Sequence, residues 1–189
     1  MSYIFSVFCS ILRSLYRTVF KKHKSNKDRN ASELSNLIFH NRKNYITSSF
    51  GYRDVISTSK GDTNAFHDGV DYGTNRIKLP QYPVDNGIII ACGADDERSG
   101  AKYVWIEYPQ LGVKMIHYHL DTIKVKTGQT VNRNTILGYT GKTGKVTGIH
   151  LHLGVKLLSG GGYIDPEAWF ENYKEKESKE LCLKESKEK

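Results

Sequence analysis

The chain has few cysteines for its length: three among 189 residues, namely Cys9, Cys92 and Cys182. They are scattered and odd in number, so the sequence predicts neither a disulfide framework nor a cysteine-based zinc knuckle. A length of 189 residues gives room for one domain with extensions, and for a core large enough to fold without such cross-links.

The sequence also lacks a long uninterrupted hydrophobic run. Its most apolar stretch, residues 2–20, contains Arg13 and Arg17, which argue against a transmembrane helix. The stretch has no positive charge before its apolar part and no clear cleavage site, so it is a poor secretory signal. Its helical periodicity favours an amphipathic helix that lies on a membrane surface or a partner protein through residues 2–24. Packing of this helix on its own domain is an equally good interpretation.

Positive charge is concentrated at one end of the chain. The formal net charge is +8, of which residues 1–30 carry +6, whereas residues 171–189 hold six lysines and six glutamates and carry none. The remainder has only +2, so we expect no specific nucleic-acid partner. These shifts divide the chain into a basic arm and linker (1–30), a short helix or linker (31–45), a central domain (46–170) and a charged tail (171–189).

Short runs of β-forming residues fill the central domain. Turn residues separate them and no helical periodicity intervenes, so the sequence predicts a mostly β fold with an antiparallel sheet. The expected strands are residues 87–92, 102–108, 113–120, 135–139 and 149–157. Short helices are expected at both ends of the domain: Asn30 and Glu33 form a capping-box pattern for the first, and Asp165 is the N-cap of the second.

Histidines gather in short β-like segments. His150 and His152 follow a glycine-rich stretch, residues 138–148, which predicts a loop, and strict alternation places both histidines on one face of a strand. His117 and His119 alternate in the same way and are expected to share a face. A histidine in a strand is commonly just a half-buried residue, so one such pair alone is weak support for a metal site.

The glycine-rich loop also contains Gly141-Lys142-Thr143, which is similar to the end of a phosphate-binding loop. The glycine that such a loop needs five residues earlier is replaced by Ile136, and a strand pattern rather than a helix follows. A nucleotide site is therefore not indicated.

Six segments within residues 46–170 carry a resemblance to a known family: residues 48–53, 67–71, 83–84, 118–120, 138–153 and 163–166. In their order and spacing they resemble the motifs of the lysostaphin/LytM-type (M23) zinc metallopeptidases. The resemblance implies a LytM-type, sandwich-like antiparallel β fold and zinc-dependent hydrolysis of bacterial peptidoglycan, at a cross-bridge or in a stem peptide. It does not extend to the basic arm or to the charged tail.

The resemblance assigns the site roles position by position. It implies His67, Asp71 and His152 as ligands of Zn²⁺, and His119 and His150 as catalytic residues. Two imidazoles and one carboxylate suit zinc, and three protein ligands leave a fourth position for water. Because no His-Glu-x-x-His helix supplies a glutamate base, the two catalytic histidines are the available groups for proton transfer and for facing the oxyanion. The sequence does not divide these two roles between them.

One position departs from the family pattern. The family usually has a tyrosine two residues before the first catalytic histidine, whereas this chain has His117 there and Tyr118 one position later. We expect His117 to fill the place of the tyrosine rather than to alter substrate contacts. Residues 54–66, 93–101 and 141–148 are expected to form the walls of a narrow substrate groove.

Two other functions compete with the peptidase. One is a non-catalytic relative that serves as a scaffold or activator of cell-wall hydrolases, and the other is a membrane-tethered or partner-tethered assembly protein dominated by residues 2–24. The presence of all three ligand positions favours the enzyme. Its site of action would be the bacterial cell wall, and the weak export signal favours a bacteriophage protein over unconventional membrane anchoring.

Overall fold

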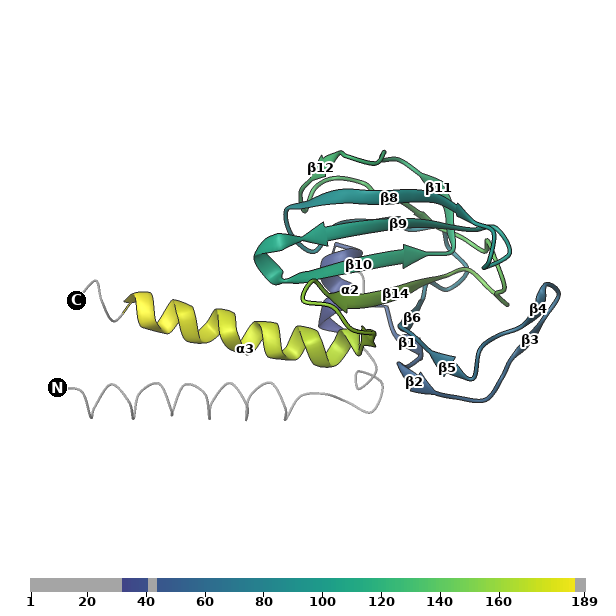
Figure 1. Cartoon of the computed structure of the whole chain (residues 1–189), viewed down its shortest axis with the longest axis horizontal. Coiled ribbons are helices and arrows are strands. Elements are labelled where there is room, and N and C mark those ends of the chain that lie inside the picture. The colour runs from purple at the N-terminus through teal and green to yellow at the C-terminus, as the bar shows by residue number, and fades with distance from the viewer. Residues whose placement is uncertain (1–31, 41–43, 186–189) are drawn as a thin grey trace. The chain divides into compact units, whose positions relative to one another are not determined.

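The computed structural model describes residues 32–40 and 44–185, with side chains through residue 175, and most of its elements are short β-strands (Figure 1). The strands are β1 (Ile46–Ser48), β2 (Gly51–Tyr52), β3 (Ser57–Thr58), β4 (Gly61–Asp62), β5 (Phe66–His67), β6 (Val70–Gly73), β7 (Pro80–Gln81), β8 (Gly87–Asp95), β9 (Ala101–Tyr108), β10 (Val113–Tyr118), β11 (Leu120–Ile123), β12 (Thr130–Val131), β13 (Gly138–Thr140), β14 (His150–Leu157) and β15 (Tyr163–Ile164). The helices are α2 (Glu33–Ile38), the 3₁₀ turn η1 (Pro109–Leu111) and α3 (Pro166–Glu185).

The largest sheet has eight strands. Its order is β1-β6-β14-β10-β9-β8-β12, and β15 pairs with Val155 and Lys156 of β14, beyond the residues of that strand that pair with β6. Neighbouring strands in this order are antiparallel throughout. The predicted antiparallel sheet is therefore confirmed, because hydrophobic alternation and short turns between consecutive runs favour this arrangement.

A second, three-stranded sheet in the order β11-β13-β7 covers one face of the first. The contact is direct, since buried His117 of β10 hydrogen-bonds Gln81 of β7 across the two layers. The chain passes from one sheet to the other at His119, which lies between β10 and β11 with a φ of +67°. Leu151 and Leu153 of β14 are fully buried, as expected for the core side of a two-layer β fold.

The glycine-rich segment differs in detail from its prediction. Residues 138–140 form β13 rather than the start of a loop, and the expected strand at 135–139 begins only at Gly138. The loop proper follows Thr140 and contains Gly144 with a φ of +85°, a conformation that glycine adopts without steric cost. This loop returns the chain to β14.

Both predicted helices are present, and their ends correct the predictions. The helix α2 is capped by Ser32, whose Oγ accepts a hydrogen bond from Ser35 N at 2.9 Å, so Asn30 was the wrong cap; Asn30 itself lies outside the described residues. Asp165 is confirmed as the cap of α3, because its Oδ1 accepts from Glu167 N at 2.9 Å. The helix α3 is 20 residues long rather than short.

The chain divides into two compact units. Residues 31–170 form one unit, and residues 1–30 together with 171–189 form the other. The described part of the second unit is the continuation of α3 to Glu185, so at least these residues of the charged tail are helical. The predicted amphipathic arm lies outside the described residues. Within the part of the chain that the structure describes, no helix is long and apolar enough to cross a membrane.

An arm built from residues 51–67 precedes the first long strand of the sheet. Strand β2 pairs with β5 at its base, and β3 pairs with β4 at its tip. Figure 1 shows this arm extending beyond the sheet near β6. The arm ends at His67, and so its base is tied directly to the candidate site.

Candidate metal centre and groove

Two neighbouring strands bring the predicted ligands together. In the β6–β14 pair, Asp71 lies opposite His152, so both side chains leave the sheet on the same face. His67 is the last residue of β5, and the turn at Asp68 and Gly69 returns the chain into β6. Residues that are 85 positions apart in sequence, His67 and His152, are thereby placed side by side.

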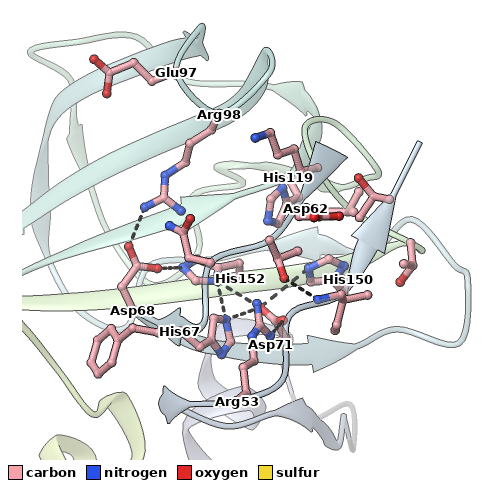
Figure 2. Close-up of a pocket in the computed structure, with 18 residues that line it drawn as sticks. Arg53, Asp62, His67, Asp68, Asp71, Glu97, Arg98, His119, His150 and His152 are labelled. Atoms are coloured by element: carbon pink, nitrogen blue, oxygen red, sulfur yellow. Dashed lines mark hydrogen bonds and ion pairs between the residues drawn. The ribbon is translucent and has the colours of Figure 1, made fainter. Parts of the chain in front are cut away.

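The three side chains form a compact triangle of donor atoms (Figure 2). His67 Nε2 lies 2.9 Å from His152 Nδ1 and 3.1 Å from Asp71 Oδ1, and His152 Nδ1 lies 3.0 Å from the same carboxylate oxygen. All three residues are buried, with 3%, 3% and 9% of their surfaces exposed for His67, His152 and Asp71. One ion could therefore be reached by one atom of each residue.

Hydrogen bonds outside the triangle orient both imidazoles. His67 Nδ1 lies 2.7 Å from the carbonyl oxygen of Ser49, to which it donates, so its Nε2 presents a lone pair to the triangle. His152 directs its other nitrogen, Nε2, toward Asp68 Oδ1 at 3.3 Å. This arrangement leaves Nε2 of one ring and Nδ1 of the other for an ion.

The charges at the triangle favour a bound cation. Burial alone raises the pKa of Asp71, but hydrogen bonds with His152 and His67, together with the charges of His152 and His150, outweigh burial and hold that pKa well below its usual range. Burial lowers the pKa of His152, yet Asp68 and Asp71 together raise it above the ordinary value. Two nitrogens and a buried carboxylate that attract positive charge form a donor set that suits zinc.

Gly69 allows the close packing of this site. A Cβ at this position would lie 2.3 Å from the carbonyl oxygen of Leu153 and 2.8 Å from the ring of His152. Neither neighbour can move without displacing β14, because one is strand backbone and the other a donor in the triangle. Only glycine fits between the predicted ligands of β5 and β6.

Two further histidines, His119 and His150, lie beside the triangle. Their ring centroids are 4.8 Å apart, and His150 Nε2 is 3.7 Å from Asp71 Oδ1. His119 Nδ1 lies 2.8 Å from the carbonyl oxygen of Thr143, and His150 Nδ1 lies 3.0 Å from that of Gly148. Each ring donates to its carbonyl, so each leaves Nε2 as its free nitrogen.

Burial keeps both of these rings neutral near pH 7. Burial, reinforced by the neighbouring His150 and His152, lowers the pKa of His119 to about 3. The pKa of His150 is also lowered, again chiefly by burial, although the charge of Asp71 opposes the shift. A neutral imidazole with a free nitrogen can accept a proton.

The prediction that His117 and His119 share a face is wrong. Strand β10 ends at Tyr118, and the positive φ of His119 interrupts the alternation, so only His119 turns toward the triangle. His117 points into the core, where its Nδ1 lies 2.7 Å from Gln81 Oε1, and burial lowers its pKa to about 3. Its complete burial agrees with the expectation that it does not contact substrate.

A groove runs over the triangle, and Figure 2 shows its lining. All three segments predicted as walls contribute to it, which confirms that prediction. Residues 54–66 supply Ile56, Thr58, Asp62, Thr63, Asn64 and Phe66; residues 93–101 supply Glu97 and Arg98; residues 141–148 supply Lys145, Val146 and Thr147.

The sequence did not reveal two charged contacts at the site. Arg53 Nη1 lies 3.4 Å from Asp71 Oδ2 and also donates to Ser48 Oγ. Arg98 Nη2 lies 2.5 Å from Asp68 Oδ2. Arg53 lies in the family motif at residues 48–53, and this position could have indicated that it is near the site. Nothing in the sequence pairs the loop residue Arg98 with Asp68.

Comparison with known proteins supports the fold and identifies the family. Residues 65–166 match the sequence profile of Peptidase family M23. The peptidoglycan DD-endopeptidase ShyB of Vibrio cholerae is 36% identical over 89 residues, which are 47% of this chain and 20% of ShyB. The chain therefore spans about a fifth of the length of that relative.

Two solved structures have a similar fold. The catalytic domain of the antimicrobial peptidase lysostaphin from Staphylococcus simulans superposes with a TM-score of 0.58 at 23% identity, covering 68% of this chain and 92% of that domain. A zinc-containing peptidase from Vibrio cholerae gives a TM-score of 0.50 at 32% identity, covering 64% of this chain and 35% of that one. The predicted lysostaphin-like β fold is thus confirmed.

Proposed function

The chain belongs to peptidase family M23, and on this basis we propose that it is a zinc-dependent endopeptidase that hydrolyses peptide bonds of bacterial peptidoglycan. The observation that carries the proposal is the buried triangle of His67, Asp71 and His152, with donor atoms about 3 Å apart at the floor of a groove. A non-catalytic scaffold would not need these three donors to converge.

In this proposal the triangle holds zinc and the two flanking histidines handle protons. Zinc bound by His67, Asp71 and His152 would polarise the scissile carbonyl and acidify a water molecule. His119 and His150 present free Nε2 atoms on the same side of the sheet, within reach of a peptide in the groove. One ring accepts the proton of the attacking water and later gives it to the leaving amine of the cleaved bond. The other ring takes up a proton from solvent at its free nitrogen and then donates a hydrogen bond toward the developing oxyanion.

We assign the base to His150 and the second role to His119. The Nε2 of His150 lies 3.7 Å from the Asp71 carboxylate, whose negative charge stabilises the imidazolium that forms when His150 accepts a proton. His119 has no carboxylate at a comparable distance among the contacts of the described residues, and its pKa is lowered to about 3. Its protonation therefore requires the charge that develops on the substrate.

Peptidoglycan is the proposed substrate because ShyB, a relative over almost half of the chain, is a peptidoglycan DD-endopeptidase. The groove walls carry both signs of charge, with Lys145 and Arg98 among Asp62 and Glu97, and so they favour neither a glycine bridge nor a stem peptide. Action at the bacterial cell wall follows from this substrate. A bacteriophage origin, and a membrane or protein partner for residues 2–24, stay predictions.

Digestion of purified cell walls tests the proposal. Walls with several cross-bridge types are incubated with the protein, with and without a zinc chelator, and the soluble fragments are identified by mass spectrometry. We expect chelator-sensitive release of peptides, and the masses identify the bond. Absence of cleavage in every wall type, with zinc present and the protein folded, would contradict the proposal.

A further inference from the structure

The imidazole of His152 has a second nitrogen that faces away from the donor triangle. His152 is buried, and its Nε2 lies 3.3 Å from Asp68 Oδ1. This buried nitrogen forms no hydrogen bond of regular geometry among the described residues, and the carboxylate of Asp68 lies within ion-pair distance of it. The position of Asp68 therefore decides whether the N–H of His152 is satisfied, and with it which nitrogen carries the proton.

Asp68 is held by a second contact through its other oxygen. Arg98 Nη2 lies 2.5 Å from Asp68 Oδ2, so the carboxylate bridges the guanidinium and the imidazole (Figure 2). Asp68 and Arg98 side chains are only 18% and 34% exposed, which places this ion pair largely out of solvent. A charged hydrogen bond in such surroundings fixes geometry better than one at a solvated surface.

Arg98 is itself seated by the turn between β8 and β9. Its backbone N donates to Asp95 Oδ1 at 3.2 Å, and its Nε lies 3.9 Å from Asp95 Oδ2. The guanidinium carbon lies 4.8 Å from the centre of the Tyr118 ring, and the hydroxyl of Tyr118 donates to Asp95 Oδ2 at 2.6 Å. The guanidinium is thus held by an aromatic face and two carboxylates, all on the groove side of the sheet.

We propose that Asp68 and Arg98 are positioning residues for His152: Asp68 fixes the orientation and tautomer of this ring, and Arg98 clamps Asp68 in place. The inference rests on the proposed function, since it concerns how the chain prepares one of its zinc ligands. Carboxylates that accept the outer N–H of a metal-binding histidine typically contribute 10- to 100-fold to metal affinity, that is, about one to two orders of magnitude.

A purely structural role is the competing explanation. The Asp68–Arg98 pair connects the turn after β5 to the β8–β9 turn, and it could serve only to hold this wall of the groove. In that case its removal would lower the unfolding midpoint or alter substrate KM, but it would leave the affinity for zinc unchanged. Zinc affinity, measured without substrate, separates the two roles.

The test measures zinc affinity of the metal-free full chain by competition with a chromogenic chelator. Asp68→Asn keeps the shape and one acceptor oxygen but removes the charge, and we expect affinity to fall about 10-fold; Asp68→Ala removes the acceptor, and we expect a fall toward about 100-fold. Asp96→Asn is the matched control, because it removes a carboxylate of the β8–β9 turn, which also carries Arg98, and the side chain of Asp96 is exposed and does not line the groove. It should leave affinity unchanged.

A double-mutant cycle tests the clamp. Arg98→Met should lower zinc affinity several-fold in the wild-type background and have no effect in the Asp68→Ala background, because its influence passes through Asp68. Equal effects in both backgrounds would show that Arg98 does not act on His152 through this carboxylate. The absorption spectrum of the cobalt(II)-loaded protein gives a second readout, since Asp68→Asn should change it without loss of the fold.

The outcomes separate the two proposals. If the folded wild-type protein binds no zinc, the proposed function fails. If wild type binds zinc, and Asp68→Asn and Asp68→Ala bind it equally well while circular dichroism shows them to be folded, the positioning role alone is overturned. Unchanged affinity together with a lowered unfolding midpoint identifies the structural role instead.

Discussion

Two segments of this protein have the same His-x-His pattern, yet their histidines end up in different places. In residues 150–152 both imidazoles lie on the groove face of β14, one beside the donor triangle and one in it. In residues 117–119 the first imidazole is buried in the core against Gln81, and only the second reaches the site. The difference arises from the backbone. Strand β14 is continuous through its pair, whereas β10 ends at Tyr118 and the chain turns at His119 with a φ of +67°.

The comparison shows what a period of two can and cannot establish. Alternation places residues on faces only while the strand remains regular, and one residue in the left-handed region transfers the following side chains to other directions. Here that residue is also a candidate catalytic group, because the corner between two sheets occurs at the groove. Sequence alternation therefore placed His150 and His152 correctly on one face, but it wrongly placed His119 on the same face as His117.

The largest effects should come from substituting the two histidines of β14 one at a time. His152→Ala removes a donor of the triangle, so we expect zinc affinity to fall by more than about 100-fold, beyond the range of outer-sphere changes, and wall digestion to be lost. His150→Ala removes only the proposed base, so zinc affinity should stay within a few-fold while the rate of digestion falls about 100- to 10,000-fold. Zinc titration and fragment release measure both quantities.

His117→Gln is the matched control from the other segment. It keeps a hydrogen-bonding group beside Gln81, and it lies outside the groove, so zinc affinity and digestion at neutral pH should remain close to wild type. If His150→Ala lost as much zinc affinity as His152→Ala, the proposed roles of His152 as a zinc ligand and of His150 as a base that does not bind zinc would be wrong.

A smaller effect should appear in the pH dependence of folding. The pKa of His117 is lowered to about 3 by burial, so below the ordinary histidine value near 6.5 the unfolded chain binds a proton that the folded chain does not. The free energy of unfolding should therefore fall by about 1.4 kcal/mol per pH unit from this residue as the pH drops from 6.5 toward 3. In His117→Gln this contribution disappears, so the curve of stability against pH should be flatter than that of wild type.

Urea unfolding at a series of pH values measures this slope. Gln81→Met is the control, because it removes the hydrogen-bond partner but leaves the buried imidazole. It should lower stability at every pH without flattening the curve. Equal slopes for wild type and His117→Gln would contradict a neutral, buried His117.

The smallest effect concerns the backbone at His119 and His150, the two proposed catalytic histidines. At His119, asparagine tolerates the left-handed conformation and valine does not, so His119→Val should be less stable than His119→Asn by about 1–2 kcal/mol. At His150, which lies in a regular strand, His150→Val should be at least as stable as His150→Asn, because β-branched residues suit strands. Unfolding midpoints of the four variants provide the comparison. The same order at both positions would argue against the corner at His119.

Much of the fold and the site could be predicted from local pattern. The antiparallel sheet followed from short β-like runs separated by turns. The pairing of His150 with His152, and the nearness of Asp71, needed only strand alternation and the family motifs. The three walls of the groove were also identified: residues 54–66 lie between two family motifs, residues 141–148 lie within a third, and residues 93–101 are a turn between two expected strands.

The rest depended on contacts between distant residues, which a single sequence does not contain. Nothing local links Arg98 to Asp68, or Gln81 to His117, because each pair joins different strands or turns. The cap of α2 was placed at Asn30 because that residue and Glu33 fit a motif, but Ser32 is closer to the helix and its Oγ accepts the bond. The strand break at His119 was hidden because histidine carries no strong signal for a positive φ.

The tight fit of Gly69 against β14 has a consequence for how this protein could change its substrate. The floor of the groove has no spare volume between Gly69 and the backbone of Leu153, so a new side chain there would separate the residues proposed to bind the metal. Diversification of specificity must therefore take place in the surrounding loops, which can lengthen or exchange charge without disturbing the floor. An engineer who seeks a different cleavage preference should leave the turn after β5 intact and randomise the groove walls at residues 54–66, 93–101 and 141–148.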